Sequence, residues 1–90
     1  MNIDLVGKKD ADRLMRNMVL GIDGIAQVAK GSVITYWTGD ATDEVHQKKV
    51  GKAAWTLHEN GFVELFQRKV GQRMTELGPI GLFDYVAVVR

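Results

Sequence analysis

The stretch that most constrains this chain is GKAAWTLHENGFVELFQRKVG, residues 51–71, in which a helical pattern changes to a strand pattern at a glycine. One arc of the helical wheel is apolar and is expected to face a core; it holds Val50, Ala53, Ala54 and Leu57. Gly61 stands where helices commonly end in a left-handed residue. The run FVELFQRKV, residues 62–70, follows without a linker and is predicted to be a strand. The chain must therefore pack a helix against a sheet.

Two further strands are predicted from the same kind of pattern. SVITYWTG, residues 32–39, is rich in β-branched and aromatic residues and lies between glycines. LFDYVAVVR, residues 82–90, is the expected antiparallel partner of residues 62–70. The segment between them, residues 71–81, contains three glycines and the only proline. It is expected to form a long loop at the tip of a hairpin.

Two helices are predicted. From Asp10 to about Lys30, apolar residues recur at helical spacing, which indicates one amphipathic helix. Gly21 and Gly24 each weaken a helix by about 1 kcal/mol, so a break near GIDG into two shorter helices stays open. The second helix is expected over residues 41–60; its predicted start involves Asp40 or Thr42 as cap and Asp43 and Glu44 in the first turn.

These elements predict an α+β fold with two main helices on one face of a small three-stranded antiparallel sheet. The strands are residues 32–38, 62–70 and 82–90, in a single domain that spans residues 1–90. In the strand 62–70, Val63 and Leu65 share one face and Phe62 and Phe66 the other. Because both faces are partly apolar, an unplaced element or a second subunit is expected on one of them, so a homodimer is a serious alternative.

Composition narrows the classes of protein. The formal net charge is +1, so only a clustered placement of the basic residues would favour nucleic acid. The chain has no cysteine, which excludes disulfides and thiolate metal sites. No apolar run approaches the roughly 20 residues that span a bilayer, and no secretory signal is recognisable at the N-terminus. We expect a cytoplasmic protein without a membrane partner.

Trp55 is the candidate binding residue that stands out. The wheel places it on the side opposite the apolar arc, with Lys48, Lys52 and Glu59, and with Lys49 and Thr56 at the edge. A large apolar side chain on a solvated face suggests a docking surface for DNA or protein. The alternatives are that the first helix or the 71–81 loop covers Trp55, or that it forms a dimer contact.

The run LHENG, followed by FVELFQRKV, a glycine-containing loop and FDYVAVVR, resembles the C-terminal half of winged-helix DNA-binding domains over residues 43–90. The chain also looks similar to small prophage and mobile-element proteins. The resemblance implies that the helix contacts a DNA groove through Lys48, Lys49 and Lys52, with Trp55 beside them, and that the wing contacts the DNA backbone through Arg68, Lys69 and Arg73. A strand-like segment and the acidic turn TGDATDE replace the helix that would precede the recognition helix, so a different α+β module that shares the helix and hairpin stays open.

Catalytic and metal-binding patterns are weak. Ser32 is the only serine and lacks a nucleophile-elbow motif, and no glycine-rich phosphate loop follows a strand. His46 and His58 project in different directions from a helix and would not chelate one metal. Asp40, Asp43 and Glu44 are more readily explained as helix-start residues than as cation ligands. We expect a non-enzyme without a cofactor.

Two functions therefore compete. The first is a non-catalytic, winged-helix-like DNA-binding regulator, for which a phage or mobile element is the expected source. The second is a small protein-interaction module or inhibitor that acts on a host complex through Trp55 and the 71–81 loop. DNA binding predicts affinity that falls steeply with salt, whereas protein binding predicts dominance of Trp55 and weak salt dependence.

Overall fold

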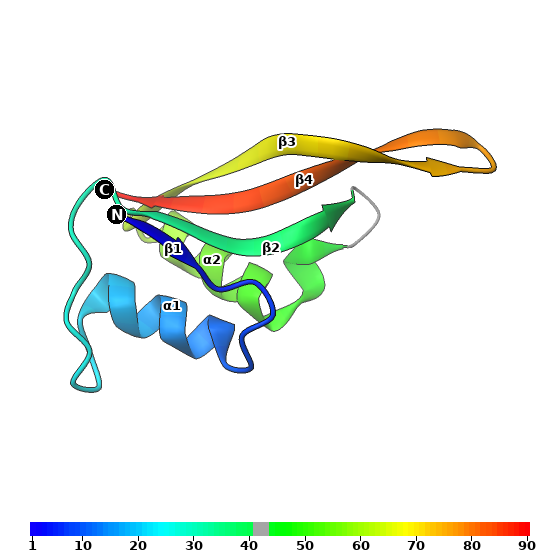
Figure 1. The fold of residues 1–90 in the computed structure, drawn as a ribbon. Helices are drawn as coiled ribbons and strands as arrows, with labels where there is room; N and C mark the ends of the chain where they lie inside the picture. The colour runs from blue at the N-terminus through cyan, green and yellow to red at the C-terminus, as the bar shows by residue number, and fades with distance from the viewer. Residues whose placement is uncertain (41–43) are drawn as a thin grey trace.

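The computed structural model describes residues 1–40 and 44–90. A four-stranded sheet carries two helices, as Figure 1 shows. In chain order the elements are β1 (Asn2–Asp4), α1 (Ala11–Leu20), β2 (Val33–Asp40), the short 3-10 helix η1 (Val45–Gln47), α2 (Lys49–Glu59), β3 (Val63–Thr75) and β4 (Gly78–Val89). The predicted α+β class with two helices is thus confirmed.

The sheet has the strand order β1-β2-β4-β3 and is mixed. β1 pairs with β2 in parallel, whereas β2 with β4 and β3 with β4 are antiparallel. The prediction of three antiparallel strands was therefore wrong by one strand, β1. A strand of three residues is too short to show an alternating pattern, and its pairing is fixed by the parallel partner β2. β4 comes last in the sequence but lies at the centre of the sheet.

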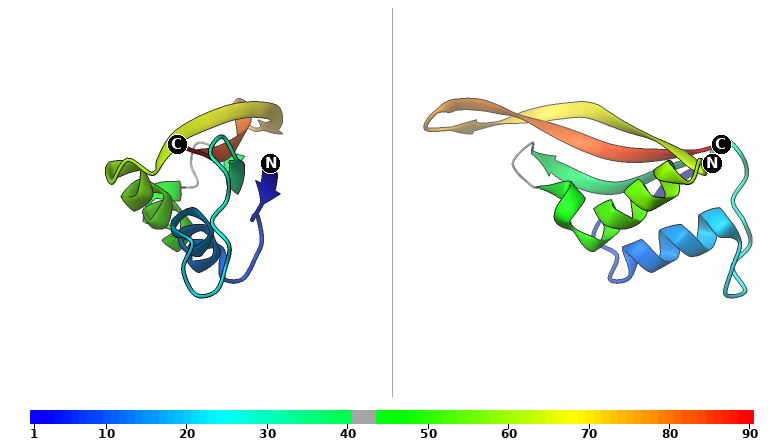
Figure 2. Two further views of the ribbon diagram at one scale, coloured as in Figure 1. Left: turned by 90° about the vertical axis from the view of Figure 1, so that its left-hand side faces the viewer. Right: turned by 180° about the vertical axis from the view of Figure 1, so that it is seen from behind.

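Both helices pack on the same face of the sheet, side by side, as the two views of Figure 2 show. The core between the layers takes the predicted apolar arc of α2 together with Met15 and Val19 of α1 and Ile34 of β2. Met15 and Ile34 have no exposed surface, and each buried aliphatic side chain of this size stabilises the fold by about 1.5–3 kcal/mol. The core is thus a single layer between helices and sheet.

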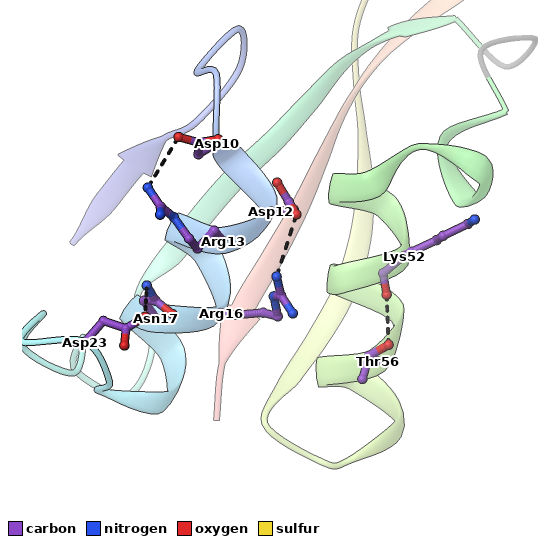
Figure 3. Close-up of polar contacts among 8 residues, drawn as sticks. All are labelled: Asp10, Asp12, Arg13, Arg16, Asn17, Asp23, Lys52 and Thr56. Carbon is purple, nitrogen blue, oxygen red and sulfur yellow. Dashed lines mark hydrogen bonds and ion pairs between the residues drawn. The ribbon is translucent and has the colours of Figure 1, made fainter.

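The first helix is much shorter than predicted. α1 ends at Leu20, and Gly21 takes a left-handed conformation with φ 66° that returns its N–H to the carbonyl of Asn17. Asp23 and Gly24 also have positive φ, so neither the single helix to Lys30 nor a second helix forms. The segment 21–32 instead lies along α1, where the Asn17 amide donates to Asp23 (3.0 Å, Figure 3) and Gln27 donates to the Val19 carbonyl. These side-chain hydrogen bonds hold the segment in place of the backbone hydrogen bonds that a longer helix would have formed.

The second helix starts later than predicted. Asp40 is the last residue of β2 and not a helix cap, while Thr42 and Asp43 lie outside the described residues. Glu44 has φ 47° and precedes η1, so it is not in the first turn of α2. Gly51 explains the contact between η1 and α2, because a Cβ there would lie 1.7 Å from the Val45 carbonyl oxygen. α2 ends at Glu59 and is followed by the C-cap residue Asn60 and by Gly61, whose φ of 81° matches the predicted left-handed position.

The hairpin of β3 and β4 is longer than predicted, and residues 71–81 are not a loop. β3 continues to Thr75, β4 begins at Gly78, and only two residues turn between them. β2 ends at its Asp40–Leu82 pair. Residues 71–81, here called the arm, pair with each other except for Gly71, which pairs with Leu82. The arm projects past the helices (Figure 1) and accounts for an extent of 47 Å along the molecule against 22 Å across it. Met74 and Leu77 are exposed on it.

The two faces of β3 are as predicted. Val63 and Leu65 belong to or pack against the core, whereas Phe62 and Phe66 are exposed. The helices cover only the face that carries Val63, and the opposite face of the sheet carries no helix (Figure 2). Neither helix in the described part of the chain has the length and apolar character needed to span a membrane.

Candidate nucleic-acid interface

The three lysines predicted on the second helix are all exposed at its N-terminal half. Lys48 is the N-cap residue of α2, and its Nζ lies 5.5 Å from the centre of the Trp37 ring. A cation over an indole face is attracted by the ring's quadrupole, typically by about 0.5–1 kcal/mol at an exposed site. This contact holds Lys48 over the edge of β2.

Trp37 reaches this position because of a β-bulge. The register between β2 and β4 shifts between Thr35 and Trp37, which leaves Tyr36 as the extra residue. A bulge places two successive side chains on nearly the same side of a strand. Tyr36 is buried and Trp37 packs against the core, both on the helix-covered side. Burial raises the pKa of the Tyr36 hydroxyl to about 12, and the neighbouring Tyr85 adds to the shift.

A basic groove forms where the two helices begin. It has a volume of about 310 Å³ and lies between the loop before α1, the middle of β2 and the start of α2. Trp37 lines it, and four lysines surround it: Lys8, Lys9, Lys48 and Lys49. We call these four lysines and Trp37 the basic groove. A neighbouring depression between the helices, lined by Arg16, Lys49 and Lys52, continues it along the α1–α2 seam.

The carboxylates nearest the groove have other partners. Asp10 pairs with Arg13 and Asp12 with Arg16, both along α1 (Figure 3). Within residues 1–40 and 44–90 the four lysines of the basic groove form no ion pair. Lys52 also extends from α2 without an ion pair in this part of the chain, and its backbone carbonyl accepts a hydrogen bond from the Thr56 hydroxyl (Figure 3). Five lysines that form no ion pair among the described residues therefore line the two depressions near the starts of the helices.

The three basic residues predicted on the wing have a different setting. Arg68 donates to Asp84 at 3.0 Å, and Thr38 donates to the same carboxylate at 2.8 Å. These hydrogen bonds, first from Arg68 and then from Thr38, lower the pKa of Asp84 below its usual range. Arg73 pairs with the buried Asp40. Lys69 alone of the three forms no ion pair among the described residues, so the hairpin offers less free positive charge than its sequence suggests.

Trp55 lies apart from the basic groove. Its side chain is 47% exposed, so neither α1 nor residues 71–81 cover it. The His46 ring meets it edge-on at 5.9 Å and the His58 ring at 5.5 Å, and a groove beyond it is lined by Tyr36, Leu65, Phe66 and Gln67. Trp55 thus faces β3, and the lysines Lys48 and Lys49 face the start of α1.

Sequence reasoning missed Lys8, Lys9 and Trp37. The adjacent lysines were visible in GKKDADRLM, but nothing local related them to residues 48–49, some forty positions later. Their approach depends on both helices beginning at the same end of the sheet. The only local signal was a pair of lysines just before a helix start.

Metal ligands and nucleophiles are not assembled in the described residues. No group of three histidine, aspartate or glutamate side chains lies close enough there to hold a metal ion. Asp40 pairs with Arg73, and Ser32 is buried. No family model, curated protein or solved structure matches the chain.

Proposed function

We propose that this protein is a non-catalytic DNA-binding module, winged-helix-like in that a helix with exposed lysines precedes a projecting hairpin. The observation that carries the proposal is the basic groove, in which four lysines that form no ion pair within residues 1–40 and 44–90 approach from two separate segments. A regulatory role is part of the same proposal, supported by the resemblance of residues 43–90 to winged-helix domains, and the phage or mobile-element origin is supported by the separate likeness of the chain to small prophage proteins.

The groove suits a phosphate backbone. Ammonium groups bind phosphate oxygens as strongly hydrated point charges, and each neutralised phosphate releases condensed counterions. Trp37, already engaged by Lys48 at 5.5 Å, gives the groove an apolar floor against which a sugar can pack. The starts of α1 and α2 add backbone N–H groups that favour negative charge. The site is accordingly expected to bind without strong sequence preference.

The set of residues proposed to contact DNA differs from the sequence prediction at the helix starts, on the hairpin and at Trp55. Lys48, Lys49 and Lys52 remain the proposed helix contacts, joined now by Lys8 and Lys9. On the hairpin, Lys69 is the cation free to reach a phosphate, because Arg68 and Arg73 already bind Asp84 and Asp40. Trp55 lies outside the basic groove, in a separate depression with Lys52 and Thr56 and beside the groove against β3, and is not required for this binding mode.

The test is fluorescence anisotropy with labelled random-sequence duplex DNA, titrated at several salt concentrations. Lys48→Ala is expected to lower affinity several-fold at low salt and to reduce the slope of log affinity against log salt by about one. The double variant Lys8→Ala, Lys48→Ala should reduce it by about two. Circular dichroism confirms that each variant stays folded.

Lys30→Ala is the matched control. It removes the same charge from the exposed turn just before β2, and Lys30 does not line the basic groove. Its affinity for DNA is expected to stay within about twofold of the parent's. Equal losses from Lys30→Ala and Lys48→Ala would show that total charge and not the groove governs binding. Absence of binding at the lowest salt would overturn the proposal.

A second candidate function, a protein-interaction module, is favoured by one observation. Trp55 exposes nearly half of its surface beside a groove that includes Leu65 and Phe66, and exposed aromatic side chains of this kind commonly anchor protein partners. The same titration separates the candidates. Trp55→Ala should leave DNA affinity unchanged if the basic groove is the site, and a partner bound through Trp55 would be retained at high salt.

A further inference from the structure

β3 lies at the edge of the sheet and has one side without a strand partner. Within the described residues β4 is the only strand that pairs with it. The Arg90 N–H donates to the Phe62 carbonyl at 3.0 Å, so Phe62 and every second residue after it direct their backbone groups toward β4. Leu65, Gln67 and Lys69 therefore direct theirs outward. The carbonyl of Val63 is contacted by His58 at 3.1 Å, so the open stretch begins after it.

This edge is not protected along its first half. Phe66 is 49% exposed, Val70 is similarly exposed on the same strand, and so is Phe62 directly before the strand. Proteins usually guard exposed edges with charges, prolines or bulges, because unpaired backbone groups invite a further strand. Here the bulge between Lys69 and Gly71 comes only at the end of the stretch, and the charged Glu64 and Arg68 within it are already paired inside the chain with Arg90 and Asp84. The open part of the edge is thus confined to about residues 64–69.

We propose that a second copy of this chain pairs with β3 in antiparallel orientation, about a two-fold axis through Phe66. The axis is perpendicular to the sheet, so the helices of both copies stay on one side and the two sheets join into one. The two Phe66 side chains would face each other, and Leu65 of each copy would exchange backbone hydrogen bonds with Gln67 of the other. This inference does not depend on DNA binding.

Charge complementarity favours the second copy as occupant. With Phe66 on the axis, Glu64 of one copy lies opposite Arg68 of the other, and the same pair repeats on the other side of the axis. Shifting the axis to a neighbouring residue removes both matches. Within each chain Glu64 already binds Arg90 and Arg68 binds Asp84. The joined sheet would carry the alternating row Arg90, Glu64, Arg68, Asp84 across its interface.

Trp55 fits the same arrangement. The groove between α2 and β3 includes Trp55 together with Leu65 and Gln67, the two residues that would meet their counterparts across the interface. On the helix-covered side a Leu65–Gln67 pair of the two chains would therefore cover part of the exposed indole. An edge contact thus accounts for both the exposed phenylalanine on one face and the exposed tryptophan on the other.

The test is sedimentation velocity with two charge-reversal variants. The parent is expected to sediment as a dimer at micromolar concentration and as a 10.0 kDa monomer on dilution. Glu64→Lys alone places like charges opposite Arg68, and Arg68→Glu alone places like charges opposite Glu64. Each variant by itself should dimerise at least tenfold more weakly. An equimolar mixture of the two should recover the parent's affinity, because both cross-pairs are then complementary.

Recovery in the mixture also shows that the variants are folded. A parent that stays monomeric over the whole range, or a dimer that neither reversal weakens, would overturn the proposal. Loss of dimer without recovery on mixing would also contradict the two-fold register.

A second experiment tests the backbone pairing. Gln67→Pro removes an outward N–H of the proposed interface and should weaken the dimer. Gln72→Pro removes an outward N–H beyond the bulge and should leave the dimer intact.

Discussion

The body of the molecule and the arm have the same two strands but different surroundings. In the body β3 and β4 carry Val63, Ala87 and Val89 against two helices, and all three are buried. In the arm, residues 71–81, the ladder continues without a helix or a third strand. Leu77 at its tip is fully exposed and Met74 72% exposed. Backbone pairing therefore extends the hairpin, but side-chain burial stabilises only the part that the helices cover.

The largest contrast is expected between two methionines. Met15 is fully buried in α1, and Met15→Ala should lower the free energy of unfolding by about 2–5 kcal/mol because it leaves a cavity. The same substitution at Met74 in the arm should change it by less than about 0.5 kcal/mol. Urea denaturation followed by circular dichroism measures both. A comparable loss at Met74 would mean that the arm packs against something.

A second contrast uses glycine. In a helix interior Gly→Ala normally stabilises by about 1 kcal/mol, yet Gly51 lies where an added Cβ would be 1.7 Å from the Val45 carbonyl oxygen. We expect Gly51→Ala to destabilise the protein by about 1–3 kcal/mol. Gly71→Ala, in the arm with no atom near the added Cβ, should be close to neutral. Stabilisation by Gly51→Ala would contradict the close approach of η1 to α2.

The smallest change in the free energy of unfolding is expected for a substitution at Asp84, where the body meets the arm. Asp84 accepts hydrogen bonds from Arg68 and Thr38, which lower its pKa. A lowered folded-state pKa stabilises the protein above the usual aspartate range and ceases to do so as the pH falls through the folded pKa. Asp84→Asn should therefore cost at most about 1 kcal/mol at neutral pH, and the difference should disappear as the pH falls through the lowered folded-state pKa of Asp84.

Asp10→Asn provides the comparison for this third prediction. Asp10 is half exposed and pairs at 3.3 Å with Arg13, which lies three residues further along at the start of α1. Its replacement should have a smaller effect at neutral pH than that of Asp84. The measurement is urea denaturation from about pH 7 to pH 2. An equal or larger effect at Asp10 would show that the three-strand contact at Asp84 adds nothing.

Local patterns predicted the body well. The apolar arc of α2, the strand over residues 33–40 and the division of β3 into a Val63 face and a Phe66 face all follow from the periods of helix and strand. Gly61 ended the helix as expected. These features depend on contacts close in sequence or on one buried face, which a single sequence carries directly.

The arm and the basic groove could not be predicted in the same way. Glycine and proline near residue 79 suggested a loop, but β4 has no neighbour on its outer side there, so a missing N–H does no harm. Left-handed residues at Gly21 and Asp23 overrode a helical pattern that ran on to Lys30. Lys8 and Lys9 meet Lys48 and Lys49 only through the packing of two helix starts. Contacts between residues far apart in the chain produce no pattern in the local sequence from which they could be predicted.

The central position of β4 also determines when the sheet can form during synthesis of the chain. β4 pairs with both β2 and β3, yet it is the last element of the sheet to be translated. Until it emerges from the ribosome, β2 and β3 have no strand between them, and the helices have only separate strands to cover. The strand pairs that join β2 and β3 through β4 can therefore form only after β4 has been translated. A nascent chain stalled before residue 78 should still be recognised by chaperones as unfolded.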